Sequence, residues 1–136
     1  MDLVALVSRT GVRLELHPAP RPHDRGAELP VWEARLIGTG LAASMICPEA
    51  TWEPNSLADF LHGLDGASRG WEGDVFWQSE EAELRLTACH HKLNTVLMTV
   101  VIEQGAPPRW RCEAELELDP GVFHRLATDA SRLGHR

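Results

Sequence analysis

The sequence predicts an α+β fold: a single domain with a mostly antiparallel, twisted sheet and two helices packed on one of its faces. Three observations lead to this prediction. Several segments alternate apolar and polar residues, as strands with one buried face do. Two other segments, 56–65 and 120–133, carry apolar residues at helical spacing. The strand segments come in runs and do not alternate with helices, which is typical of the α+β class.

The bulk composition is that of an ordinary globular domain. The chain has 136 residues, enough to bury a core without disulfides or metals. Its thirteen basic and twenty acidic residues give a formal net charge of −7, which argues against nucleic acid as a partner and suits a basic protein. No apolar run reaches the roughly 20 residues that cross a bilayer, and the N-terminus lacks the basic region of a secretion signal. We therefore expect a cytoplasmic protein that does not bind membranes.

The N-terminal part predicts strands and one long loop. Segments 3–8 and 12–17 form a hairpin around a turn at Arg9-Thr10-Gly11. Residues 18–30 are proline-rich and charged, and a structureless loop of this length is either functional or disordered. Segment 31–47 is extended, and Gly38-Thr39-Gly40 within it predicts a bulge or bend.

The remaining elements complete the order βββ-α-ββββ-α, with about six or seven strands. Ser56 and Asp59 form a capping pair for the first helix, which ends at Gly66. A strand containing Trp77 follows, and then strands 83–91, 94–103 and 110–118. Asp119-Pro120 opens the closing helix. We expect both helices to pack on the sheet face that carries four inward leucines: Leu84, Leu86, Leu116 and Leu118.

No set of residues predicts catalysis, a metal site or a cofactor. Cys89-His90-His91 contains metal-ligating residue types, but consecutive residues of a strand point to opposite faces. The other histidines, including His17, have no recognisable partners. The three cysteines follow no disulfide or zinc spacing and are expected to be free thiols. We expect a protein without enzymatic activity.

Two tryptophans in the stretch GWEGDVFWQS allow two interpretations. Trp71 and Trp77 can clamp the first helix onto the sheet, together with Trp52, because each buried indole contributes a few kcal/mol. They can also form an interface, because aromatic residues are common binding hot spots. The core interpretation is favoured.

The C-terminal half resembles a family of uncharacterised bacterial proteins, a domain of unknown function. The resemblance lies in the motifs G-W-x-G, W-x-S and L-x-L-x-A-x-H, present here between Gly70 and His90, and in the tryptophan strand and closing helix that follow. It covers about half of the chain, from Phe60 to Leu133, and implies no activity. As a small, acidic α+β protein, the chain is also similar in type to the immunity proteins of bacterial toxin systems.

These observations favour a protein-binding module. We expect an immunity-type or accessory protein that sequesters a basic partner through an acidic strand face. The partner-binding residues would be Glu113, Glu115 and Glu117 on the outward side of one strand, with Glu80 and Glu81 at a turn beside it. The alternative is a small-ligand-binding protein or an enzyme that uses a cleft near Trp71, Trp77 and His90.

Overall fold

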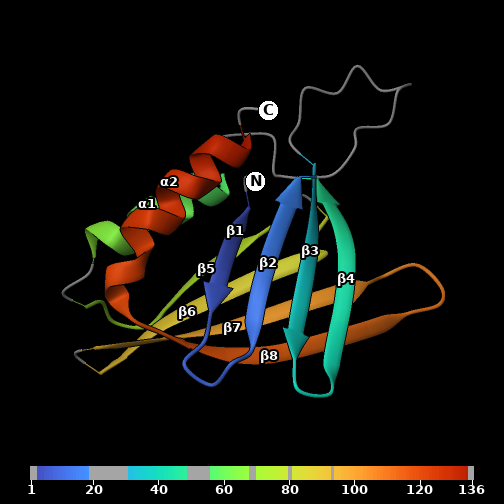
Figure 1. Ribbon diagram of the computed structural model, residues 1–136, viewed down its shortest axis with the longest axis horizontal. Coiled ribbons are helices and arrows are strands. Elements are labelled where there is room, and N and C mark those ends of the chain that lie inside the picture. Colours follow the sequence, from blue (N-terminus) through green and yellow to red (C-terminus); the bar gives the residue numbers. More distant parts are fainter. Residues whose placement is uncertain are drawn as a thin grey trace.

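The computed structural model describes residues 3–18, 31–48, 56–67, 70–79, 81–92 and 94–134. In this part of the chain the elements follow the order ββββ-α-ββββ-α (Figure 1). The strands are β1 (Val4–Val7), β2 (Arg13–Pro18), β3 (Val31–Gly38), β4 (Leu41–Pro48), β5 (Asp74–Gln78), β6 (Leu84–Lys92), β7 (Thr95–Gln104) and β8 (Trp110–Leu118). The helices are α1 (Leu57–Gly66) and α2 (Phe123–Gly134), and a 3-10 turn, Pro120–Val122, precedes α2.

The strands form two four-stranded antiparallel sheets. Strands β1 to β4 pair in sequence order in the N-terminal sheet, and β5 to β8 do the same in the C-terminal sheet. The predicted α+β class and the antiparallel pairing are confirmed, whereas the prediction of one sheet of six or seven strands is wrong. Alternation along a strand shows that one face is buried, but it carries no information about which sheet the strand joins.

The strand missing from the prediction comes from segment 31–47. In place of a bulge or bend, residues 38–41 form a hairpin turn: Gly38 pairs with Leu41 across a two-residue loop, Thr39-Gly40. Gly40 has a φ of +70°, a conformation that glycine adopts far more readily than other residues. A bulge and a tight turn make the same local demand for glycine, so the sequence pattern did not separate them.

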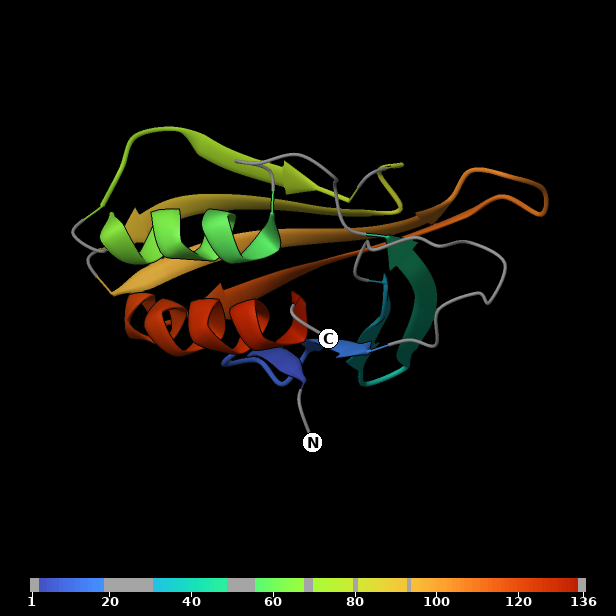
Figure 2. The same ribbon diagram turned by 90° about the horizontal axis from the view of Figure 1, so that it is seen from above.

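The hydrophobic core lies between two layers. The C-terminal sheet forms one layer, and the two helices together with the N-terminal sheet form the other (Figure 2). The strands of the two sheets cross steeply, and α2 lies beside β1 with α1 on its other side (Figure 1). The four predicted inward leucines of β6 and β8 are all buried in this core together with the apolar side chains of both helices. The helices therefore pack on the predicted face.

Both helix starts follow the predicted capping. The Ser56 hydroxyl oxygen accepts a hydrogen bond from the Asp59 backbone N–H at 3.0 Å, and α1 ends at Gly66. The Asp119 carboxylate accepts from the Gly121 N–H at 2.8 Å at the start of the 3-10 turn. Each cap satisfies a backbone donor that has no partner inside the helix.

The two sheets are also joined at the edge of β8. The Ser8 hydroxyl oxygen accepts from the Glu117 N–H at 2.9 Å, and the Arg9 N–H donates to the Glu117 carbonyl at 3.0 Å. The Arg9 guanidinium also donates to the Thr95 hydroxyl, at 2.9 Å. The two bonds to Glu117 pair part of an edge strand that would otherwise present unpaired backbone groups.

Two predicted features lie outside the described residues. They are Trp52 and the proline-rich segment beyond Pro18, the last residue of β2. In the part of the chain that is described, no helix has the length and apolar character needed to cross a membrane.

Candidate functional site

The predicted acidic row lies on β8, on the side of the C-terminal sheet that points away from the core. Glu113 and Glu115 are exposed and Glu117 is half-buried, while the alternate residues Leu116 and Leu118 are buried. We call this side the acidic face. Strand register assigns it the outward residues of β5 to β8: Asp74, Phe76, Gln78, Arg85, Thr87, Cys89, Leu97, Thr99, Val101, Glu103, Arg111, Glu113, Glu115 and Glu117.

Arginines neutralise one end of the acidic face. Arg111 lies 2.9 Å from Glu113 and 3.8 Å from Glu103, and Arg85 lies 3.3 Å from Glu103. Within the described part of the chain, the carboxylates of Glu115 and Glu117 form no ion pair. On β8 the negative charge available to a partner is therefore that of Glu115 and Glu117, because Glu113 is already paired with Arg111. Asp74, at the start of β5, is an exposed carboxylate on the opposite edge of the same face.

Glu81, the described one of the two turn acids, lies apart from the acidic row. Glu81 is exposed in the turn between β5 and β6, where its N–H donates to the Glu83 carboxylate at 3.2 Å. Strands β6 and β7 separate this turn from β8, so the structure does not place Glu81 beside Glu113. Glu80 lies outside the described residues.

The acidic face also carries an exposed aromatic side chain that the sequence analysis did not select. Phe76 on β5 is 58% exposed. Register places it in one row with Glu115, three strand spacings away, which is about 14 Å. The signal for this residue was present in the sequence, because an inward Trp77 requires its neighbour Phe76 to point outward.

The three residues of the predicted cleft do not come together. Trp77 is buried and packs against Trp32 of the N-terminal sheet, with ring centroids 6.1 Å apart. Trp71 packs edge-on against His90, with centroids 5.2 Å apart. Trp77 pairs with Leu86 on β6, four residues or about 13 Å along that strand from His90. The core interpretation is therefore confirmed for Trp77, and Trp71 is a half-buried neighbour of His90.

The contact between Trp71 and His90 leaves two polar atoms unsatisfied. The indole Nε1 of Trp71 and the imidazole Nε2 of His90 are both buried, and neither forms a hydrogen bond with any of the described residues. Two surface hollows in the described structure lie elsewhere. One, of about 410 Å³, is at the β7–β8 hairpin around Trp110, and one, of about 290 Å³, lies over Ala42 and Ser44 on the N-terminal sheet. Neither is lined by Trp71, Trp77 or His90.

No residue set in the described ranges is arranged to bind a metal ion: no three His, Cys, Asp or Glu side chains converge there. Cys89 shares the outward side of β6 with Arg85, and His90 packs on Trp71 near the core, as strand alternation requires. Cys47, Cys89 and Cys112 are free thiols, as predicted. That this protein uses no metal or cofactor and has no enzymatic activity stays a prediction.

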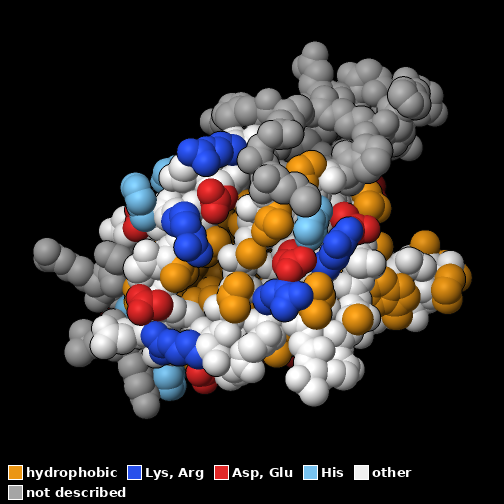
Figure 3. Space-filling view, in the orientation of Figure 1, with side chains coloured by type: hydrophobic (Ala, Val, Ile, Leu, Met, Phe, Trp, Pro, Cys, Tyr) orange, Lys and Arg blue, Asp and Glu red, His pale blue; other side chains and the backbone are white. Residues whose placement is uncertain are grey.

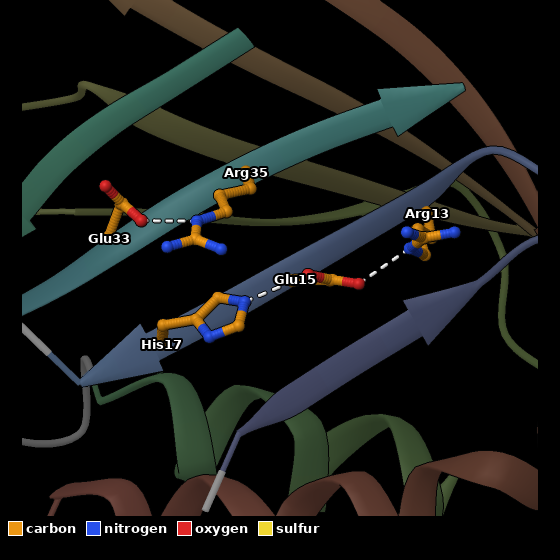
Figure 4. A network of polar contacts seen from close by, with 5 residues as sticks. All are labelled: Arg13, Glu15, His17, Glu33 and Arg35. Atoms are coloured by element: carbon orange, nitrogen blue, oxygen red, sulfur yellow. Dashed lines mark hydrogen bonds and ion pairs between the residues drawn. The ribbon is translucent and has the colours of Figure 1, made fainter. Parts of the chain in front are cut away.

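A polar network on the outer side of the N-terminal sheet was also missed (Figure 4). The Glu15 carboxylate accepts from Arg13 Nε at 2.6 Å and contacts His17 Nε2 at 2.9 Å. On the next strand, Arg35 Nε donates to the Glu33 carboxylate. The sequence analysis gave His17 no partner, and that assignment is wrong. Residues two apart on a strand lie on the same face, and this spacing was the available signal.

We expect the contribution of Glu15 to stability to depend on pH. Hydrogen bonds from His17 and Arg13 hold the pKa of Glu15 below its ordinary value of 4.5. Because the charged carboxylate is favoured in the folded state, its contribution is complete above about pH 4.5 and is lost as the pH falls through the lowered pKa. In urea unfolding, Glu15→Gln should therefore be less stable than the native chain at pH 7, and the difference should shrink at pH 3. A difference that is equal at both pH values would contradict this assignment, and Asp129→Asn serves as the control.

We expect Cys47 to be chemically inert in the folded protein. It is fully buried, and burial, with a smaller effect from the charge of Glu83, raises the pKa of its thiol to about 12. Because the thiolate is the reactive form, iodoacetamide at pH 8 should modify the half-buried Cys89 and Cys112 well before Cys47. Peptide mass spectrometry measures the three rates, and in denaturant they should become similar. Equal rates in the native protein would refute the prediction.

The comparisons with known proteins identify a family but no activity. Comparison with curated proteins and with solved structures returned no match. The model of one family, described as "Family of unknown function (DUF6228)", matches residues 6–135. This match spans both sheets and both helices, beyond the half of the chain that carries the sequence motifs. The chain therefore belongs to the family of unknown function DUF6228.

Proposed function

We propose that this protein is a non-enzymatic, cytoplasmic binding module that sequesters a basic protein through the acidic face. The observation that carries the proposal is the pair Glu115 and Glu117, whose carboxylates form no ion pair within the described chain although Arg111 and Arg85 lie on the same face. A partner's Lys or Arg side chains supply the missing countercharges. An immunity-type or accessory protein acts in this way.

The rest of the acidic face supports protein binding over simple solvation. Phe76 exposes most of a large apolar side chain about 14 Å from Glu115, and the row between them contains only Thr87 and Thr99. A sheet face with an aromatic residue at one edge and unpaired charge at the other is a suitable contact surface, because aromatic residues are frequent hot spots. The charges speed the encounter and select a basic partner.

The alternative function, a ligand-binding or catalytic cleft, has less support. Its three residues divide between a core contact of Trp77 with Trp32 and the separate pair of Trp71 with His90. A binding cleft needs polar groups that converge in one concavity.

The experiment is affinity capture from the native cell lysate, with the full chain as bait at about 50 mM and 500 mM NaCl. We expect a basic protein that is retained at low salt and released at high salt, because screening weakens exposed charge pairs. The double variant Glu115→Gln/Glu117→Gln should retain much less of it. The matched control Asp59→Asn/Asp129→Asn removes two carboxylates from the helices and should retain it fully. Capture that is insensitive to salt, or equal loss in both double variants, would refute the proposal.

The same assay ranks the predicted residues. Glu113→Gln should weaken capture less than Glu115→Gln, because Glu113 is already paired with Arg111. Glu81→Gln should have little effect, because Glu81 lies in the β5–β6 turn and not among the strand residues that form the acidic face.

A further inference from the structure

The outer side of the N-terminal sheet differs from the rest of the surface in its charge. We call it the neutral face and define it by the outward residues of β1 to β4: Ala5, Val7, Arg13, Glu15, His17, Glu33, Arg35, Ile37, Ala42, Ser44 and Ile46. Val7 is 57% exposed and Ile46 is 50% exposed. Figure 3 views the molecule from this side and shows apolar side chains interspersed with paired charges.

The charges of the neutral face cancel within the face. Two arginines and two glutamates pair along the strands, Arg13 with Glu15 and Arg35 with Glu33, and His17 joins Glu15. The pairs link residues two apart on one strand, so the side chains lie along the sheet (Figure 4). With neutral His17, the formal charge of the face is zero, although the whole chain carries −7. Burying charges that are already paired within the face also costs less desolvation free energy than burying isolated charges.

We propose that the neutral face is a self-association surface on which a second copy of this chain docks. Charge is the reason for choosing this partner. Two copies that each carry −7 repel one another, and the repulsion is least where the approaching surfaces are neutral. The neutral face meets this condition, whereas the acidic face, with unpaired Glu115 and Glu117, does not. Exposed Val7 and Ile46, with the half-buried Ile37 between them, supply the apolar contact.

The positions of the apolar residues fit a two-fold arrangement. Val7 lies on the edge strand β1 in the row of Arg13 and Ile37, and Ile46 lies on the edge strand β4 in the row of Glu33. They occupy opposite corners of the face. A two-fold axis that lies in the interface between these corners brings Val7 of each copy onto Ile46 of the other. The hollow of about 290 Å³ over Ala42 and Ser44 leaves room for a side chain of the opposite copy.

The size of the face predicts a weak dimer. Four strands at about 4.8 Å and six residues at about 3.3 Å give about 19 by 20 Å, or about 400 Å² per copy. A standard stable interface buries about 800 Å² per partner. The dimer should therefore be weak and form reversibly, as small interfaces do.

The test is sedimentation velocity of the full chain between about 5 μM and 1 mM. We expect the mean sedimentation coefficient to rise with concentration, and to rise further in 500 mM NaCl because salt screens the repulsion between the copies. This salt response is opposite to that of the proposed basic complex, so the two proposals can fail independently. A single monomeric species up to 1 mM at both salt concentrations would overturn the inference.

Variants locate the surface. Val7→Asp/Ile46→Asp should abolish association, and Ser44→Glu, which places a charge in the hollow, should weaken it at least tenfold. The matched control Phe76→Asp alters an equally exposed apolar residue on the acidic face and should associate as the native chain does. Far-UV circular dichroism and thermal unfolding confirm that each variant is folded, and Ser44→Glu provides an independent test if the double variant is not. Association that survives both neutral-face changes, or that Phe76→Asp abolishes, would refute the inference.

Discussion

Replacing Trp32 with alanine is expected to lower the free energy of unfolding by about 3–5 kcal/mol, a large part of the roughly 5–15 kcal/mol that stabilises a domain. Trp32 is 1% exposed and is the largest of the fully buried side chains. It extends from β3 of the N-terminal sheet and packs against Trp77 of the C-terminal sheet at 6.1 Å between ring centroids. Its removal leaves a cavity at a contact between the two sheets.

Urea unfolding followed by tryptophan fluorescence and circular dichroism measures this effect. Trp32→Phe should lower the free energy of unfolding much less than Trp32→Ala, because it keeps an aromatic ring. In the described part of the chain, the buried Nε1 of Trp32 forms no hydrogen bond that would be lost. Phe76→Ala, a change of a 58% exposed aromatic residue, should shift the midpoint little. A loss below about 1 kcal/mol for Trp32→Ala would show that the contact between the sheets does not depend on this side chain.

Replacing Phe123 with alanine is expected to have an effect of similar size, about 3–5 kcal/mol, for a different structural reason. Phe123 is the first residue of α2 and is fully buried. With Leu126, Ala127 and Ala130 it forms the buried side of the helix, so its loss weakens the packing of α2 on the core.

Hydrogen exchange separates local from global effects of this change. Phe123→Ala should increase exchange of amides in α2 and in the adjacent α1 more than in β3 and β4, because elements near the lost contact open first. Arg125→Ala, an exposed position of the same helix, is the control and should leave exchange and stability close to native. Uniform destabilisation of both sheets, with no excess in the helices, would contradict this assignment.

The proposed sites differ in how far the sequence predicted them. The outward direction of Glu113, Glu115 and Glu117 follows from alternation along one strand and is confirmed. The pairing of Glu113 with Arg111 also follows from spacing, because residues two apart share a face. The contact of Arg111 with Glu103 depends on the register between β7 and β8, which alternation does not define. The row that joins Phe76 to Glu115 needs the register of all four strands.

The tryptophans show the same limit. Their size and apolar character predicted burial near the first helix, and Trp77 is buried. The partner of Trp77 is Trp32, 45 positions earlier in the chain and in the other sheet. No local pattern encodes that contact. Trp71 is close to Trp77 in sequence, but the path of β6 places it against His90.

The sequence by itself determined much of the local structure: the α+β class, antiparallel strands, both helices with their capping residues, and the buried side of the strands that alternate clearly, such as β8. These features depend on neighbouring residues, through side-chain periodicity and the conformational preferences of Ser, Asp, Pro and Gly. Only the tertiary structure decided that the strands divide into two crossed sheets, that Gly38–Leu41 is a hairpin turn, and that a neutral face and an acidic face lie on the outer sides of different sheets. Those outcomes depend on contacts between segments that are far apart in the sequence. The free energy of these contacts comes from the packing of the whole core.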